Sequence, residues 1–175
     1  MNLVEEIAQA QTKASREIIA IWVGKDQTRF KQLMKIVLGE DAELARRAAW
    51  PMNQCIEEHP QLASPILPEL VRQLGDQKSH PAIRRNIVKA LQVIDLPDDL
   101  LARIFDTCYE RLTDPEETVA VKAYSMTVLT RICKREPALT DEVILAIERG
   151  LPHGTAAFRA RARMAFRELK SPRKE

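Results

Sequence analysis

Four basic residues recur along the chain at intervals of 38, 38 and 39 positions: Arg46, Arg84, Lys122 and Arg161. A regular row of cations can grip the phosphates of a nucleic acid or the carboxylates of an acidic protein. The row can also be structural, because Asp76 lies eight positions before Arg84 and Asp114 eight before Lys122, so each could pair with that basic residue. We interpret these six residues as a structural ladder and keep phosphate binding as the alternative.

The Trp50-Pro51 pair is a second place where recognition chemistry could arise. A proline inside a helix lacks an amide hydrogen and clashes with the carbonyl four residues back, here that of Arg47. A freed carbonyl beside an indole could form a recognition pocket, although the same pair could simply bend the helix and wedge the indole between neighbouring helices. Trp and Arg dominate binding hot spots. The residues expected to contact a partner here are Arg47, Trp50, Arg85, Asn86 and Lys89.

The last part of the chain is basic. Residues 1–130 carry 16 Lys and Arg against 19 Asp and Glu, whereas residues 131–175 carry 11 against 6. Within the basic part, Arg159 and Arg163 are four positions apart, so they share one face of a helix. They are further candidates for contact with an acidic partner, or they form an ordinary solvated face at the end of the fold.

No residue pattern makes a positive case for catalysis or metal binding. The three histidines are scattered, with no Cys or carboxylate at ligand spacing, so we expect no metal and no cofactor. Glycine-rich phosphate loops, nucleophile elbows and zinc-protease motifs are missing from the sequence. The acidic pairs Glu57-Glu58 and Asp98-Asp99 are adjacent, so their side chains diverge on a helix. An enzyme is not indicated, although catalytic groups from distant segments could still converge.

Cysteine usage and the N-terminus favour a reducing cytoplasm. Cys55, Cys108 and Cys133 are odd in number and widely spaced, and each lies in a predicted helix as a small hydrophobe. Residues 1–10 lack a basic start and do not resemble a signal peptide. The longest apolar run, Ile18–Val23, is far shorter than the roughly 20 residues needed to cross a bilayer. We therefore expect no membrane partner.

The elements that must position these residues are predicted to be helices throughout. Hydrophobic content of 45%, charged content of 30% and only five glycines favour a soluble all-α protein, and no strand-like alternation occurs. Ser64-Pro65 and Asp114-Pro115 predict two helix starts. We predict one domain over 1–175, with a capping helix at 1–24, helix pairs at 27–60, 64–95, 98–136 and 140–170, and a fraying tail at 171–175.

Periodicity predicts which side chains are buried. The capping helix is predicted to bury Leu3, Ile7, Ala10, Ala14, Ile18, Ile21 and Trp22 and to end at Gly24. Aligning the second helix of each pair on its ladder residue gives a core of Ala45, Ile83, Val121, Ala160, Ala49, Ile87, Ser125, Met164, Ile56, Ile94 and Ile132. The same alignment turns outward Arg47, Arg85, Ala123, Ala162, Pro51, Lys89, Thr127 and Phe166.

The period of about forty residues, the paired helices and a basic residue near the start of each second helix resemble HEAT repeats over about residues 27–170. The stretches RRAAWP, HPAIRRN, KAYSMTVL and FRARAR are similar to those of small bacterial HEAT-repeat proteins. The resemblance implies a right-handed αα-superhelix (a solenoid) whose second helices line the concave side. It also implies that the Asp and Arg of the ladder tie neighbouring repeats together. Lys122 replaces the usual arginine, and only two repeats carry the preceding aspartate.

These features favour a non-enzymatic adaptor that presents its second helices to a protein or peptide, because stacked repeats form extended binding surfaces. The alternative is nucleic-acid binding in the mode of the alkylation-repair DNA glycosylases, which hold a duplex against a basic HEAT-like surface. A third possibility is a structural protein that associates with itself.

Overall fold

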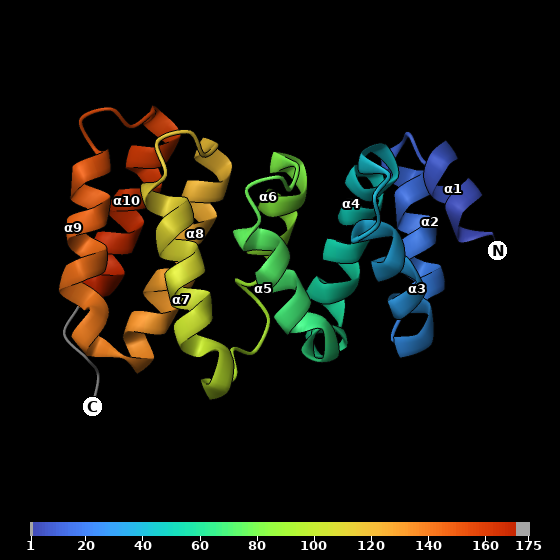
Figure 1. The fold of residues 1–175 in the computed structure, drawn as a ribbon, viewed down its shortest axis with the longest axis horizontal. Coiled ribbons are helices and arrows are strands. Elements are labelled where there is room, and N and C mark those ends of the chain that lie inside the picture. Colours follow the sequence, from blue (N-terminus) through green and yellow to red (C-terminus); the bar gives the residue numbers. More distant parts are fainter. Residues whose placement is uncertain (1, 171–175) are drawn as a thin grey trace. The chain divides into compact units, whose positions relative to one another are not determined.

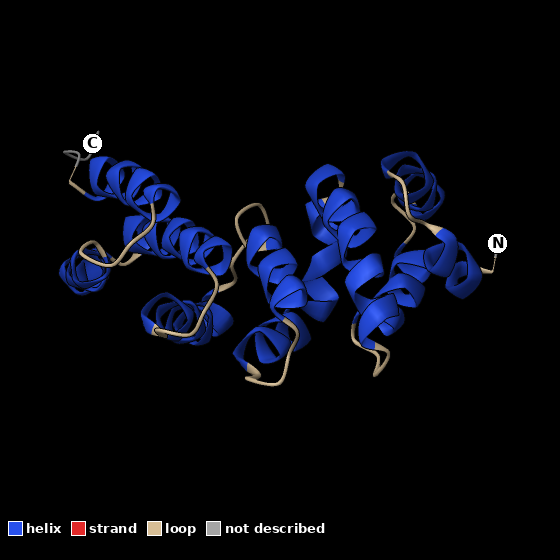
Figure 2. Ribbon diagram, turned by 90° about the horizontal axis from the view of Figure 1, so that it is seen from above, coloured by secondary structure: helices blue, strands red, loops and turns tan. Residues whose placement is uncertain are grey.

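The computed structural model describes residues 2–170, which are helical with no strand among them, as Figure 2 shows. The predicted all-α class is confirmed, whereas the right-handed course of the superhelix stays a prediction. The chain forms two compact units that divide after Asp95 and are termed unit 1 and unit 2 in chain order. Figure 1 labels the helices of each unit. The tail 171–175, which was predicted to fray, lies outside the described residues.

Unit 1 is organised around its longest helix, α4 (Ala42–Glu58). This helix packs against α2, α3 and α6, so its inward side is closely covered, and Met52 and Ile56 are completely buried. Burying an aliphatic side chain of this size stabilises a fold by about 1.5–3 kcal/mol. The other elements of the unit are α1 (Leu3–Gln9), α2 (Lys13–Val23), α3 (Gln27–Val37), the 3₁₀ helix η1 (Pro60–Ile66), α5 (Leu67–Gly75) and α6 (Pro81–Ala90).

The N-terminal segment differs from the single capping helix that the sequence predicted. The chain breaks between α1 and α2 because Thr12 caps the second helix: its hydroxyl accepts from the Ser15 amide, and the Ser15 hydroxyl accepts from the Thr12 amide, both at 3.1 Å. Helices α1 and α2 form a pair. Helix α2 packs along α4, which is the second helix of the next pair. The break also shifts the helical phase, so Ile18 and Ile21 are 57% and 75% exposed instead of buried. Gly24 ends α2 as predicted, at a φ of 50°.

Unit 2 is built in the same way around α8 (Val119–Arg135), which packs against α7, α9 and α10. Its other elements are α7 (Asp98–Thr113), the 3₁₀ helix η2 (Pro137–Leu139), α9 (Thr140–Gly150) and α10 (Ala156–Leu169). Ile132, Ser125 and Val121 of α8 are completely buried, as the alignment predicted.

Two predicted helix starts are wrong. Pro65 lies inside η1, and α5 begins only at Leu67. Asp114 ends α7 instead of starting α8, and its carboxylate accepts from the Glu116 amide at 2.9 Å, which closes a turn. Asp-Pro and Ser-Pro suit turns as well as helix N-termini, so the dipeptide alone did not decide between them.

The predicted core rows hold for α4, α6 and α8 but fail for α10. Ala160 is only half-buried and Met164 is 46% exposed, whereas Phe158 and Ala162 are buried. The buried row therefore runs through Ala45, Ile83, Val121 and Phe158. This spacing makes Arg159, not Arg161, the residue equivalent to Lys122. Three alternating arginines in the FRARAR stretch hid this shift of two positions. In α4 the alignment was wrong about Pro51, which is buried and not outward.

Candidate partner-binding site

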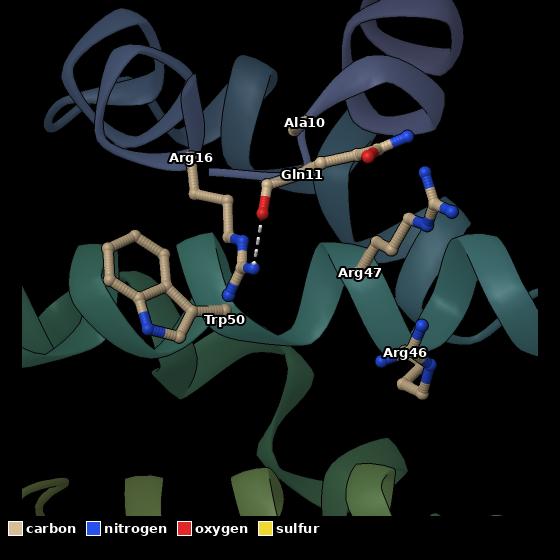
Figure 3. A pocket seen from close by; sticks show the side chains of 6 residues that line it. All are labelled: Ala10, Gln11, Arg16, Arg46, Arg47 and Trp50. Carbon is tan, nitrogen blue, oxygen red and sulfur yellow. Dashed lines mark hydrogen bonds between the residues drawn. The ribbon is translucent and has the colours of Figure 1, made fainter. Parts of the chain in front are cut away.

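A pocket of about 260 Å³ lies in unit 1 between the α1–α2 connection and α4 (Figure 3). The connection contributes backbone and the start of α2 contributes an arginine, while α4 contributes the other side chains. Two predicted contact residues, Arg47 and Trp50, meet here. The lining residues are Ala10, Gln11, Arg16, Arg46, Arg47 and Trp50.

Each arginine of the pocket is held in place. The Arg16 guanidinium lies 5.8 Å from the Trp50 ring centroid and donates to the Gln11 carbonyl at 3.0 Å, as Figure 3 shows. Arg47 donates to the carbonyl of Ala8, so it joins α4 to α1. Cation–π stacking of this kind contributes about 0.5–1 kcal/mol at an exposed site. The α1–α2 break therefore lets the connection reach the side chains of α4.

The pocket carries excess positive charge. Glu43 accepts hydrogen bonds from Arg46 at 2.7 and 3.0 Å and from Arg47 at 2.7 Å. The hydrogen bonds from Arg46, and next those from Arg47, lower the pKa of the Glu43 carboxyl to about 2. The Glu43 carboxylate thus pairs with Arg46 and Arg47, while Arg16 adds a third guanidinium group to the pocket, and the remaining charge suits an anion.

Trp50 of the Trp-Pro pair lines a pocket, in line with the first of the two alternatives that the sequence left open. Helix α4 runs through Pro51 without interruption, and the proline ring is buried. Trp50 is half-buried at the pocket, where one face meets Arg16. The helix itself therefore carries the indole to the pocket.

Asn86 has an internal role instead of the predicted partner contact. It is 7% exposed, and its side-chain oxygen accepts from Asn53 at 2.8 Å. The amide of Asn53 also donates to the Ala49 carbonyl at 3.2 Å, and that of Asn86 to the Ala82 carbonyl at 2.8 Å. The buried amide pair fixes α4 against α6, because a buried polar group without a partner is costly.

Arg85 and Lys89 lie on α6, which is the second helix of the pair that follows α3 and α4. Arg85 is exposed, and the Lys89 ammonium lies 2.7 Å from the Glu57 carboxylate of α4. This cross-helix pair shows that the exposed sides of α4 and α6 adjoin. Lys89 therefore lies at the border between α4 and α6, and Arg85 lies one turn before it on α6.

The ladder residues are held by different partners. Arg46 is exposed and pairs with Glu43. Arg84 is 8% exposed and donates to the carbonyls of Ser79 and, at 3.4 Å, Gln77. Lys122 donates to the Pro115 carbonyl at 3.3 Å. Gln77 and Pro115 are equivalent positions 38 residues apart, so Arg84 and Lys122 tie their helix to the same point of the preceding loop.

The aspartates of the ladder shape loops. Asp76 accepts from the Lys78 amide at 2.9 Å, as Asp114 accepts from that of Glu116. Asp114 also lies 3.7 Å from Arg111, a completely buried arginine that sequence reasoning missed. The sequence spacing could have indicated this pair, because Arg111 and Glu117 stand 38 residues after Gln73 and Ser79. In unit 1 the side chains of those two residues are hydrogen-bonded across the α5–α6 loop.

In unit 2 the predicted contact residues Arg159 and Arg163 are both exposed on α10. Arg159 donates to the Leu151 carbonyl at 3.3 Å, which resembles the bond of Lys122 to its own preceding loop. Arg161 is half-buried on the same helix. Arg159 thus anchors α10 to the preceding loop, whereas Arg163 belongs to the exposed face of the helix.

Burial disfavours the reactive thiolate form of the cysteines. All three are free and buried, and burial raises the pKa of the Cys55 and Cys108 thiols to about 12. Within residues 2–170 no three His, Cys, Asp or Glu side chains are grouped to hold a metal ion. None of the helices described is both long and apolar enough to span a membrane.

The chain matches the model of a known repeat family. The family model described as a HEAT repeat domain matches residues 3–163. The matched range starts in α1, in line with the observation that α1 and α2 already form a helix pair. No curated protein and no solved structure matches the chain.

Proposed function

Because this chain belongs to the HEAT-repeat family, we propose that it is a non-enzymatic adaptor that binds an acidic segment of another protein. Stacked helical repeats offer extended surfaces for such contacts. The observation that carries the proposal is the pocket of Arg16, Arg47 and Trp50, where an aromatic ring and a surplus of guanidinium groups meet.

The proposed contact surface continues from the pocket across α4 to α6. Arg85 is exposed there, and Lys89 is held by a single exposed carboxylate, which a partner carboxylate could replace at little cost. Trp and Arg are the residue types that most often contribute large binding energies. The surface of unit 1 therefore consists of Arg16, Arg47, Trp50, Arg85 and Lys89.

Arg159 and Arg163 form a separate proposed contact in unit 2. Both are exposed and share one face of α10, and Arg163 is the more available because Arg159 already donates to Leu151. We extend the proposal to a reducing cytoplasmic setting, which the three free buried cysteines support.

The nucleic-acid alternative has weaker support. A row of phosphate contacts needs cations that can reach the ligand, but Arg84 is buried on loop carbonyls and Arg46 is bonded to Glu43. A DNA-binding surface would lose affinity by about 0.9 log units per log unit of salt for each phosphate contacted. Binding of a DNA duplex with a slope of several units would favour this alternative over the acidic segment.

The chain contains two tryptophans, which makes a sharp test possible. Trp22 and Trp50 are both half-buried, and each stacks on an arginine, Arg29 at 4.9 Å and Arg16 at 5.8 Å. Only Trp50 lines the pocket. In a Trp22→Phe protein the remaining indole fluorescence reports on the pocket alone.

The experiment titrates this protein with a Glu- and Asp-rich peptide and with the same peptide carrying Gln and Asn instead. We expect a fluorescence change with the acidic peptide only. The variants are made in the otherwise unaltered chain and their affinities are measured by isothermal titration calorimetry, because Trp50→Ala removes the fluorescent reporter. Arg47→Gln and Trp50→Ala should each lose about tenfold or more in affinity, as for hot-spot residues. Trp22→Ala serves as the matched control and should bind as the unaltered chain does. Equal binding of both peptides, or equal losses for both tryptophan variants, would contradict the proposal.

A further inference from the structure

Unit 2 contains a larger hollow that the proposed contact surface does not use. It has a volume of about 550 Å³ and lies between the α7–α8 loop and the α9–α10 loop. This volume falls within the usual range of small-molecule sites, about 300–1,000 Å³. The residues that argue for a ligand are its apolar floor, Leu112, Ala146 and Phe158, and its basic rim, Lys122, Arg149 and His153.

Close packing restricts the position of the aromatic ring in the floor of the hollow. The Phe158 ring is 4% exposed and packs against two glycines. A Cβ atom at Gly150 would lie 2.6 Å from Cζ of this ring, and one at Gly154 would lie 2.6 Å from Cδ1. Real Cβ atoms do not approach so closely, so both glycines are needed for the ring to stay where it is. The two glycines therefore hold the ring at a fixed place in the floor of the hollow.

The rim is one-sided in charge. None of the residues that line the hollow is acidic. Among the described residues, no side-chain hydrogen bond or ion pair is formed by Arg149 or His153, and the Lys122 ammonium uses one donor on the Pro115 carbonyl. An ammonium group has three donors, so two stay available. An anionic group at the rim would find a guanidinium and an ammonium without displacing an existing ion pair.

The equivalent hollow of unit 1 lacks this combination. Its volume is about 450 Å³, and it lies between the α3–α4 and α5–α6 loops. Glu40 lines it, together with Gln73 of α5 and with Gln77 and Ser79 of the α5–α6 loop. Its arginine, Arg84, is buried on carbonyls. The same place in the repeat is thus polar and mixed in charge in unit 1, but apolar and basic in unit 2.

From this arrangement we infer that the hollow of unit 2 binds a small organic anion: a carboxylate with an apolar aryl or alkyl body. The body lies on Phe158 and Leu112, and the carboxylate reaches Arg149 and Lys122. Apolar burial supplies most of the affinity, and the charge-assisted hydrogen bonds fix the orientation.

Phenylbutyrate is a suitable probe, and its neutral amide, phenylbutyramide, is the matched control ligand. Two-dimensional amide NMR of the full chain follows the signals of Gly150 and Gly154 during the titration. A dissociation constant on the order of 1 mM is expected for a ligand of this size. Phenylbutyramide should bind about tenfold more weakly, since it loses the charge assistance.

Three variants locate the site. Arg149→Gln should weaken phenylbutyrate binding by about tenfold, because it removes one charged donor from the rim. Val119→Phe should abolish binding by filling the hollow from the start of α8, where Val119 is half-exposed. Lys78→Gln removes a cation from the rim of the unit 1 hollow and should change nothing.

The inference is overturned by any of three results. The first is that no amide signal of unit 2 shifts with phenylbutyrate. The second is that the neutral amide binds as tightly as the acid. The third is that the shifts gather at residues 39–42 and 73–84. Binding that is unchanged in Arg149→Gln would likewise overturn it. None of these results bears on the peptide titration in unit 1, so the two proposals fail separately.

Discussion

The loop between α5 and α6 in unit 1 and the loop between α7 and α8 in unit 2 have the same hydrogen bonds to the backbone but different side-chain pairs across them. In both, the basic residue of the second helix donates to a carbonyl seven positions earlier, Arg84 to Gln77 and Lys122 to Pro115. In both, an aspartate at the start of the loop accepts the amide two positions on. The backbone of the loop is thus held in the same way twice.

The side chains that span the two loops differ in charge. In unit 1 the Gln73 amide donates to the Ser79 hydroxyl at 3.3 Å. In unit 2 the equivalent pair is Arg111 and Glu117, with the guanidinium 3.5 Å from the carboxylate and both side chains completely buried. A neutral pair costs little to bury, whereas a buried ion pair is expensive to desolvate and more expensive to break. Equivalent positions in a repeat therefore need not tolerate the same substitutions.

The largest expected effect comes from breaking the charged pair. Glu117→Gln leaves the Arg111 guanidinium buried with Asp114 at 3.7 Å and the exposed Glu110 at 3.1 Å as its acidic neighbours. We expect a loss of about 3 kcal/mol in the free energy of unfolding, the lower end for a broken buried ion pair. Urea denaturation followed by circular dichroism measures it. The matched change in unit 1, Ser79→Ala, should cost about 1 kcal/mol; equal losses would remove the distinction between the loops.

Transferring the neutral pair into unit 2 sharpens the comparison. The double variant Arg111→Gln with Glu117→Ser should lose about 1 kcal/mol or less, since replacing both members of a buried ion pair is often neutral. The double variant is then more stable than Glu117→Gln alone. A double-mutant cycle in the same denaturation experiment gives the coupling energy of the pair. If the losses of the two single changes simply add, the two residues do not act as a pair.

The ladder residues should differ by a smaller amount. Arg84→Gln removes charged donors from two carbonyls in a buried place, and we expect a loss of about 2 kcal/mol. Lys122→Gln removes one bond from a half-exposed side chain and should cost about 0.5 kcal/mol. Thermal unfolding of the two variants, run in parallel, ranks them. A larger loss for Lys122→Gln would mean that the carbonyl bonds do not determine the order.

The smallest effect is expected from pH, and it belongs to unit 1. Hydrogen bonds from Arg46 and Arg47 lower the pKa of Glu43 to about 2, and a bond from Arg72 lowers the pKa of Glu69. A carboxyl whose pKa is lowered by folding stabilises the fold above its unfolded pKa, which is 4.5 for Glu43. This contribution is lost as the pH falls through the folded pKa, between about 4.5 and 2 for Glu43. In the Glu43→Gln variant the free energy of unfolding, plotted against pH, should change less across that range. An unchanged slope of this plot would contradict the assignment to Glu43.

Most of the fold follows from periodicity. Apolar residues at helical spacing and a repeat of 38 residues predicted the paired helices, and the buried rows of α4, α6 and α8 follow from aligning them. The alignment failed at α10 because arginines at 159, 161 and 163 offer three registers, and only the burial of Phe158 and Ala162 selects one. The break at Thr12 was missed because Thr and Ser are weak helix breakers whose capping bonds form only in the folded chain.

The site was partly predictable. Trp50 and Arg47 stand out by residue type, since an indole beside arginines is a common binding element. Arg16 could not be placed, because its contact with Trp50 depends on the α1–α2 break and on the packing of α2 along α4. Asn86 looked like a contact residue, yet its burial depends on Asn53 from another helix.

The sequence by itself determined the helical class, the repeat length and the family, because local propensity and spacing act along the chain and need no knowledge of neighbours. Tertiary structure alone decided which charges are free and which are held. Arg84 and Arg111 are buried against groups of the loop that adjoins their helix, while Arg85 and Arg149 are exposed. Solvation and pairing of a charged group depend on everything within a few ångströms of it, and residues so close in space are often far apart in the chain.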